Sequence, residues 1–296
     1  MNSKKTVLVT GATGLVGRAL CLLLEAKGHQ VRPLSRSSGD FRWDPAADKI
    51  DPTALDGVDA VIHLAGESVA QRWTAAVKRR ILDSRVQSSS LLVREILKRD
   101  RPVSYISASG INYYGFESKT PVDESADSGK GFLAEVCRQW EGAAKPLLEA
   151  GHRCVFVRTG VVLSPEGGAL AKLLPPFKAG LGGKVGSGGQ MMSWITLSDL
   201  ARVYVRSIED ETVSGPLNAV APEAVTNLEF TKAISAALKR PTALPLPAFA
   251  VKLMFGEMGR ETLLSDLPVE PAQLRAMDFS WEHEKIDNAL NQLLKK

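Results

Sequence analysis

A short apolar run, three evenly spaced glycines and a helical pattern follow one another at the start of the chain, and this order constrains the fold most. Thr6 to Val9 is β-branched and apolar, as expected of a parallel strand buried on both faces. Gly11, Gly14 and Gly17 come next at three-residue spacing. Gly11 permits a tight turn, Gly14 lets backbone N–H groups approach a phosphate, and Gly17 lets the following helix pack against the strand.

The glycine turn therefore predicts a nucleotide-binding site built largely from backbone. From this stretch we expect contacts from Thr10, Gly11, Thr13, Gly14, Leu15, Val16 and Gly17. A tight strand-to-helix turn that binds no ligand is the alternative. The strand and the helix nevertheless lie on the sides that a phosphate-binding turn requires, which favours the nucleotide site.

The Gly-x-x-Gly-x-x-Gly spacing resembles the short-chain dehydrogenase/reductase superfamily, in its extended, epimerase-like branch. Further motifs resemble an atypical subfamily of nucleoside-diphosphate-sugar epimerase-like proteins with a small C-terminal domain, over nearly the whole chain. The resemblance implies an α/β fold: a Rossmann-type doubly wound parallel sheet with a smaller C-terminal substrate lobe. We expect the NADP-binding core in residues 1–165, with returning segments near 190–222. Residues 166–296 would then form the substrate lobe and the C-terminal module.

The end of the second expected strand bears on the choice of cofactor. In NAD-binding folds an acidic residue at this place binds the ribose 2′-OH, whereas here the strand from Gln30 to Leu34 leads to Ser35 and Arg36. A carboxylate would repel a 2′-phosphate, and an arginine can hold one by charge-assisted hydrogen bonds. We therefore favour NADP over NAD. In the alternative, Arg36 is a solvated loop residue and Asp40 is the acid of an NAD site.

A second turn follows the expected strand from Val58 to Leu64. The family carries a similar His-x-Ala-Gly turn that lines the cofactor, so we expect Leu64, Ala65 and Gly66 to contact it. His63 lies inside an apolar strand, where a histidine is more often a satisfied core residue than a catalytic one.

The positions of the family's catalytic tetrad differ in this chain. Resemblance places Arg85 where the family has asparagine, Gly110 where it has serine, Leu133 where it has tyrosine and Cys137 where it has lysine. In the family the tyrosine is the general acid/base, and the lysine one turn later lowers its pKa of about 10. The chain contains no Tyr-x-x-x-Lys at all. The standard proton transfer therefore does not run here in the standard way.

Two hydroxyl groups are candidate replacements for the missing serine and tyrosine. Ser109 neighbours Gly110, and Tyr114 belongs to the Tyr-Gly pair that closes the family's serine-rich stretch. We predict Ser109 and Tyr114 as catalytic residues. An unassisted tyrosine is a poor base near neutral pH, since its pKa of about 10 leaves about one part in a thousand ionised. Arg85 is the residue of its helix that we expect to face the cofactor, with a solvent-exposed arginine as the open alternative.

Composition and charge exclude several other classes of protein. A net charge of +4 spread along 296 residues does not indicate nucleic-acid binding. Four dispersed histidines and three dispersed cysteines give no metal-ligand spacing, and the cysteines are expected as reduced core thiols in a cytoplasmic protein. We expect no signal peptide, and no apolar run approaches the ~20 residues of a membrane-spanning helix. Many relatives form homodimers through two long helices, here 75–98 and 132–150.

Local signals give further expectations. Residues 153–163 predict one strand, and 170–179 a helix broken by Pro175 and Pro176. Ser198 or Asp199 is expected to cap the helix from Leu200 to Ile208. The glycine-rich segment 180–189 is either a mobile substrate lid or a plain flexible connection.

Three functions stay open. The favoured one is an NADP-dependent reductase or epimerase acting on an unidentified small molecule, with a non-standard acid. The second is a non-catalytic NADP(H)-binding regulator or scaffold, since distant relatives have been associated with cell division. The third is a stable Rossmann domain that binds nothing, which the intact glycine turn disfavours.

Overall fold

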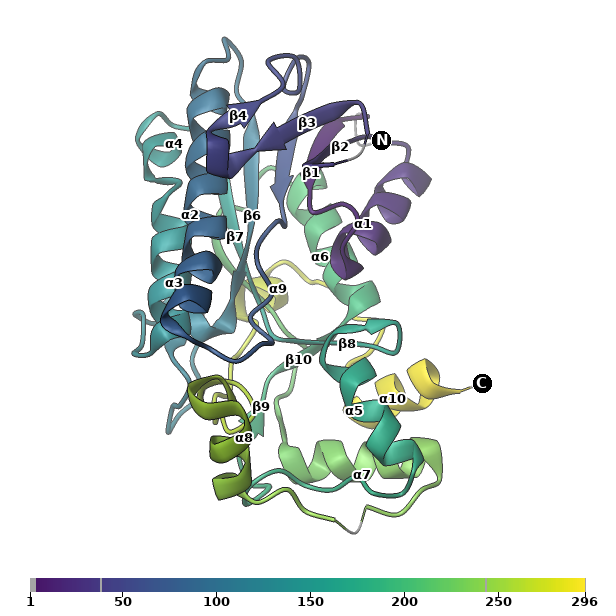
Figure 1. Cartoon of the computed structure of the whole chain (residues 1–296). Coiled ribbons are helices and arrows are strands. Elements are labelled where there is room, and N and C mark those ends of the chain that lie inside the picture. Colours follow the sequence, from purple (N-terminus) through teal and green to yellow (C-terminus); the bar gives the residue numbers. More distant parts are fainter. Residues whose placement is uncertain (1–3, 38, 243, 296) are drawn as a thin grey trace.

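A twisted eight-stranded sheet forms the centre of the upper lobe in the computed structural model, which describes residues 4–37, 39–242 and 244–295 (Figure 1). The strand order is β11-β7-β6-β5-β1-β2-β3-β4, and every neighbouring pair is parallel except β3 with β4. This is the expected doubly wound α/β fold. From β1 the chain runs outward through β2, β3 and β4, and it then returns to β5 on the other side of β1 and runs outward through β6, β7 and β11. The strands of this sheet are β1 (Thr6–Thr10), β2 (Gln30–Ser35), β3 (Phe41–Asp44), β4 (Lys49–Ile50), β5 (Ala60–His63), β6 (Ser104–Gly110), β7 (Cys154–Thr159) and β11 (Gly215–Ala219).

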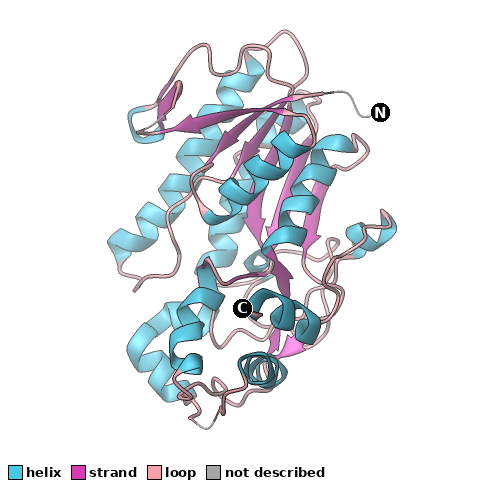
Figure 2. Cartoon of the chain, turned by 90° about the vertical axis from the view of Figure 1, so that its right-hand side faces the viewer, coloured by secondary structure: helices cyan, strands magenta, loops and turns pink. Residues whose placement is uncertain are grey.

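Helices cover both faces of the sheet, as Figures 1 and 2 show. The alternation along β1 explains why: Val7 and Val9 pack in the core under α1 and α6, while Leu8 packs in the core under α2 and α4. The helices around the sheet are α1 (Leu15–Ala26), α2 (Ala75–Leu97), α3 (Phe132–Gly142), α4 (Lys145–Glu149) and α6 (Leu197–Glu209), with 3₁₀ turns η1 (Pro45–Ala47) and η2 (Ile111–Tyr114).

The lower lobe has its own apolar cluster, which includes Leu170, Trp194, Phe230 and Leu290 (Figure 1). Two small sheets, β8 with β10 and β9 with β12, connect it to the upper lobe. Its elements are β8 (Val161–Ser164), α5 (Gly168–Lys178), β9 (Met191–Met192), β10 (Trp194–Thr196), β12 (Val225–Thr226), α7 (Asn227–Leu238), α8 (Ala248–Glu261) and α10 (Ile286–Leu294). The short helix α9 (Ala272–Ala276) instead packs against β11, with Leu274 in the core of the upper lobe.

Two elements that the sequence predicted as continuous are split. The expected strand 153–163 divides into β7 and β8 at Gly160, where a Cβ atom would lie 2.8 Å from the Ser193 carbonyl oxygen. The expected helix 132–150 divides into α3 and α4, because Pro146 has no N–H to continue the hydrogen-bond ladder.

Two other local predictions are wrong. Pro175 and Pro176 lie inside α5 without breaking it, since both face solvent and water can reach the carbonyl groups left without a donor. Helix α6 is capped by Thr196, whose Oγ1 accepts a hydrogen bond from the Asp199 N–H, and not by Ser198 or Asp199.

The glycine-rich segment 180–189 is tied to the lower lobe. The Leu246 N–H donates to the Lys184 carbonyl, and the Val185 N–H donates to Asn227 Oδ1. A Cβ atom on Gly183 would lie 2.9 Å from the Pro245 nitrogen. These contacts describe a packed connection and do not support a free lid.

Candidate functional site

The glycine turn has the geometry that its spacing predicts. Gly11 has a φ of 68°, and a Cβ atom there would lie 3.0 Å from the Leu64 carbonyl carbon, so the turn lies against the second turn after β5. A Cβ atom on Gly17 would lie 2.7 Å from the Ala12 Cα, which is the close helix–strand approach expected of this position. Gly14 is the N-cap of α1 and is exposed.

The N-terminus of α1 is suited to an anion. Within the part of the chain that the structure describes, no side chain caps this helix and no acidic residue lies in its first turn. The first N–H groups of a helix lack intrahelical partners, and its dipole favours negative charge there. The turn that contains Thr13, Leu15 and Val16 therefore presents unpaired donors to a phosphate.

Thr10 and His63 stabilise the two turns from within the core. Thr10 is fully buried, and its Oγ1 accepts hydrogen bonds from the Leu64 and Ala65 N–H groups at 3.1 and 3.2 Å. His63 lies between Thr10 Oγ1 and Ser88 Oγ, and burial lowers its pKa to about 3. His63 is thus the core residue that we expected. The Thr10 side chain therefore positions the second turn, and a contact of Thr10 with a nucleotide stays a prediction for its backbone.

The end of β2 presents a positive charge at the surface. Arg36 is exposed and forms no ion pair with any residue between 4 and 295 that the structure describes. It borders an open depression of about 450 Å³. Arg42 and Lys49 line the same depression, together with the edge of Trp43. Ser35 lies at the last position of β2, and its Oγ accepts from the Ser37 N–H.

Arg85 is half-buried and faces the second turn. Its Nη1 donates to the Glu67 and Ile81 carbonyl groups, each at 3.0 Å, and the guanidinium carbon lies 4.9 Å from the centre of the Trp140 ring. A Cβ atom on Gly66 would lie 3.0 Å from Arg85 Cζ. Burial lowers the pKa of Arg85. The guanidinium therefore lies over Gly66, and its contact with the cofactor stays a prediction.

Gly110, Leu133 and Cys137, the positions at which the resemblance places three residues of the family's tetrad, lie in the region of this arginine. A Cβ atom on Gly110 would lie 3.6 Å from Cys137 Sγ, and Leu133 is buried one helical turn before Cys137. Burial, and then the charge of Glu141, raise the pKa of the Cys137 thiol to about 11. Cys137 is therefore neutral near pH 7 and cannot supply the charge of a lysine.

Ser109 and Tyr114 belong to one buried hydrogen-bond network. Ser109 Oγ donates to Glu141 Oε1 at 2.7 Å, and Arg158 forms a two-pronged ion pair with Glu141 at 2.9 and 2.8 Å. Arg158 Nη1 also donates to the Tyr114 hydroxyl at 2.9 Å, and that hydroxyl donates to Asn218 Oδ1 at 2.8 Å. Sequence reasoning did not identify Glu141, Arg158 or Asn218 as partners in this network.

The hydroxyl groups of Ser109 and Tyr114, which we predicted as catalytic, both form hydrogen bonds with protein groups in this network. Burial raises the pKa of Tyr114, and its proton is directed at Asn218. The Ser109 proton is directed at Glu141. This geometry gives both residues a positioning role, and it argues against a direct proton transfer from either one.

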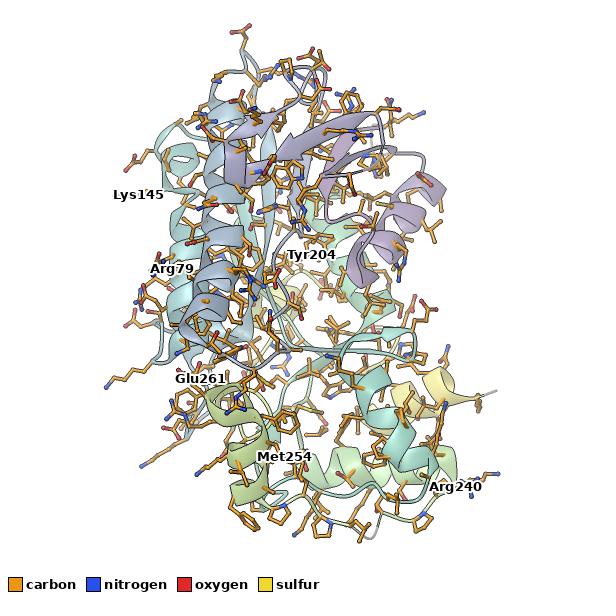
Figure 3. All side chains as sticks on the ribbon, in the orientation of Figure 1. Arg79, Lys145, Tyr204, Arg240, Met254 and Glu261 are labelled. Carbon is orange, nitrogen blue, oxygen red and sulfur yellow. The ribbon has the colours of Figure 1, made fainter. Side chains whose placement is uncertain are left out.

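The C-terminal module reaches the same region through Glu261. This carboxylate, at the end of α8 below α2 and α3 in Figure 3, accepts hydrogen bonds from the Phe132 and Leu133 N–H groups at 3.0 and 3.1 Å. It caps α3, whose N-cap residue is Gly131. The hydrogen bonds of Glu261 join residues about 130 positions apart in the sequence. The one local signal for them was an acidic side chain after a helix that contains glycines.

Two features are absent from the part of the chain that the structure describes. Among residues 4–37, 39–242 and 244–295, no helix is long and apolar enough to cross a membrane. No group of three or more metal-ligating side chains occurs in the same residues.

Comparison with known proteins identifies relatives over the whole chain. The model of the NAD dependent epimerase/dehydratase family matches residues 7–220, and a domain of unknown function (DUF1731) matches residues 246–293. The epimerase family protein Mb2239 of Mycobacterium bovis is 41% identical over 289 residues, covering 96% of each chain.

Two solved structures are similar in both fold and sequence. The human epimerase family protein SDR39U1, crystallised with NADPH, superposes with a TM-score of 0.89 at 35% identity, over 98% of this chain and 99% of that one. A nucleoside-diphosphate sugar epimerase from Corynebacterium glutamicum gives 0.82 at 36% identity, over 99% of this chain and 59% of the other.

Proposed function

The chain belongs to the NAD dependent epimerase/dehydratase family, and from this premise we propose that it binds NADP(H) and acts as an oxidoreductase on a small molecule. The observation that carries the cofactor assignment is the pairing of an uncapped α1 N-terminus with an exposed arginine at the end of β2. The human relative that was crystallised with NADPH supports it.

The residues present fit the cofactor. The N–H groups of the glycine turn would hold the pyrophosphate, Arg36 would hold the 2′-phosphate, and the nucleotide would lie across the strand ends beside Leu64 and Ala65. Ser35 would contribute a hydroxyl beside Arg36. When bound, NADP(H) supplies or accepts a hydride at its nicotinamide ring.

The chemistry that fits this chain best is reduction of a carbonyl group. Epimerisation needs a base that removes a hydroxyl proton, and Leu133 and a neutral Cys137 offer none. Reduction instead creates negative charge on the substrate oxygen. Arg85 places a fixed positive charge near Cys137, where it can stabilise that oxygen. A proton can then come from water.

A non-catalytic NADP(H)-binding regulator is the second candidate. The observation that favours it is the network of Ser109, Glu141, Arg158 and Tyr114, in which both predicted catalytic hydroxyls bind protein groups. We also propose a reducing compartment such as the cytoplasm, because Cys21, Cys137 and Cys154 are all free thiols. Pairing of two copies through α2 and α3 stays a prediction.

A fluorescence titration of the protein with NADPH and NADH tests the cofactor assignment. We expect tighter binding of NADPH, and we expect Arg36→Asp to weaken NADPH binding by tenfold or more, since it replaces an attractive charge with a repulsive one. Arg240→Asp, with the same charge change on the lower lobe (Figure 3), is the matched control and should bind NADPH like the unmodified protein. Equal, weak binding of both nucleotides would overturn the assignment.

A screen of carbonyl compounds for NADPH oxidation then separates the two candidates. NADPH oxidation by the unmodified protein that is lost in Arg85→Gln supports the oxidoreductase. Tight NADPH binding with no turnover across aldehydes, ketones and keto acids supports the regulator.

A further inference from the structure

No carboxylate among the residues that the structure describes forms an ion pair with Arg85. Arg158, the other arginine of the region, is matched by both oxygens of Glu141. No such partner exists for Arg85 among the residues that the structure describes. The nearby Glu67 carboxylate acts on Arg85 only through space, because it accepts from Gln71 Nε2 at 3.1 Å and lies 3.9 Å from Arg80 Nε. Arg85 is half-buried. A charge that is partly removed from water is normally paired, so the lack of an ion-pair partner at a candidate site indicates an anionic ligand.

The Arg85 guanidinium is also held in one orientation. Nη1 is bound to two carbonyl groups, the plane lies against Trp140, and Gly66 leaves it just enough room. Both hydrogen bonds of the guanidinium use Nη1, so Nε and Nη2 have no acceptor among the residues that the structure describes. A planar guanidinium with free donors in a fixed direction matches the two oxygens of a carboxylate or a phosphate.

The surroundings of Arg85 place it at the reacting end of the site. Its charge acts on the Cys137 thiol, and Cys137 in turn touches the position of Gly110. Both are positions where the family keeps proton-transfer residues. The glycine turn that suits the cofactor pyrophosphate is a separate feature at the start of α1.

We propose that Arg85 binds an acidic group of the substrate, and that the substrate is a small carbonyl compound bearing a carboxylate or a phosphate. The inference rests on the proposed oxidoreductase function. The same oxyanion chemistry exists in the cofactor pyrophosphate, so the test separates the two sources.

The test is calorimetric titration, first with NADPH and then, on the NADPH-saturated protein, with oxalate and with inorganic phosphate as probes. We expect at least one probe to bind the unmodified protein. Arg85→Gln should weaken that probe by about 10- to 100-fold, the effect of losing charge-assisted hydrogen bonds, and should change NADPH affinity by less than about threefold. Arg79→Gln, an exposed arginine on the same helix (Figure 3), is the matched control and should change neither.

Arg85→Lys keeps the charge but loses the planar fork, and should give intermediate probe affinity if Arg85→Gln does not fold. The proposal is overturned if neither probe binds the unmodified protein, or if Arg85→Gln binds the probes equally well. A tenfold loss of NADPH affinity in Arg85→Gln would also overturn it and assign Arg85 to the cofactor. Failure of NADPH to bind the unmodified protein would contradict the proposed function instead. Titration of the probes into nucleotide-free protein would then still test Arg85.

Discussion

Replacement of Tyr114 by phenylalanine separates the two roles that sequence and structure give to this residue. If Tyr114 donates a proton to substrate, Tyr114→Phe removes activity and leaves stability intact. If its hydroxyl connects Arg158 to Asn218, the same change leaves two atoms in the protein interior without this partner, Arg158 Nη1 and Asn218 Oδ1.

The magnitude follows from these two hydrogen bonds. A buried polar group left unsatisfied costs about 1–3 kcal/mol, with more for charged groups. Arg158 keeps its ion pair with Glu141, and Asn218 keeps the bond from its Nδ2 to the Glu270 carbonyl, so neither partner is fully stranded. We therefore expect Tyr114→Phe to lower the free energy of unfolding by about 2–4 kcal/mol.

Urea denaturation followed by circular dichroism measures this change. Tyr113→Phe is the matched control, because the Tyr113 ring packs 3.4 Å from Arg158 Cζ and a phenylalanine keeps that contact. The control should change stability by less than about 0.5 kcal/mol. If Tyr114→Phe is as stable as Tyr113→Phe, the network does not hold the site together and our assignment of a positioning role is wrong.

Two further predictions concern the core beneath the two turns. Gly17→Ala should lower the free energy of unfolding by about 1–3 kcal/mol and weaken NADPH binding at least tenfold, since the added methyl group collides with the backbone at Ala12 and displaces α1. Thermal melting measures the first effect and NADPH titration the second. Normal NADPH binding would contradict the close packing of α1 on this turn. His63 should make the protein acid-sensitive: its folded pKa is about 3 and an unfolded histidine titrates near 6.5, so its contribution is complete above about pH 6.5 and falls by about 1.4 kcal/mol per pH unit as pH drops toward 3. Urea denaturation at about pH 6.5 and about pH 5 should show a shallower pH dependence in His63→Gln than in the unmodified protein, and equal dependence would refute the buried neutral histidine.

Local sequence was sufficient for the sheet and for the glycine turn. The apolar run before Gly11 and the spacing of the glycines encode a strand, a tight turn and a close-packed helix within a dozen residues. The splits at Gly160 and before Pro146 were not predicted, because the apolar pattern continues across both places. At Gly160 the chain bends against Ser193, which is distant in sequence.

The inner part of the site depends on contacts that a local pattern does not contain. The bond from Ser109 to Glu141 joins residues 32 positions apart, and that from Arg158 to Tyr114 joins residues 44 apart. The sequence therefore identified the hydroxyl groups of Ser109 and Tyr114 but not the residues to which they are hydrogen-bonded. For Arg85, sequence left two environments open, and its contact with Gly66 and Trp140 decides between them.

A crystal structure of the protein grown with NADPH would show directly whether the glycine turn and Arg36 bind the cofactor. We expect the pyrophosphate at the N-terminus of α1, the 2′-phosphate within hydrogen-bond distance of Arg36, and the nicotinamide ring extending past Gly66 toward Gly110. This binding mode would be contradicted by a nucleotide bound away from the glycine turn, or by a 2′-phosphate that Arg36 does not touch.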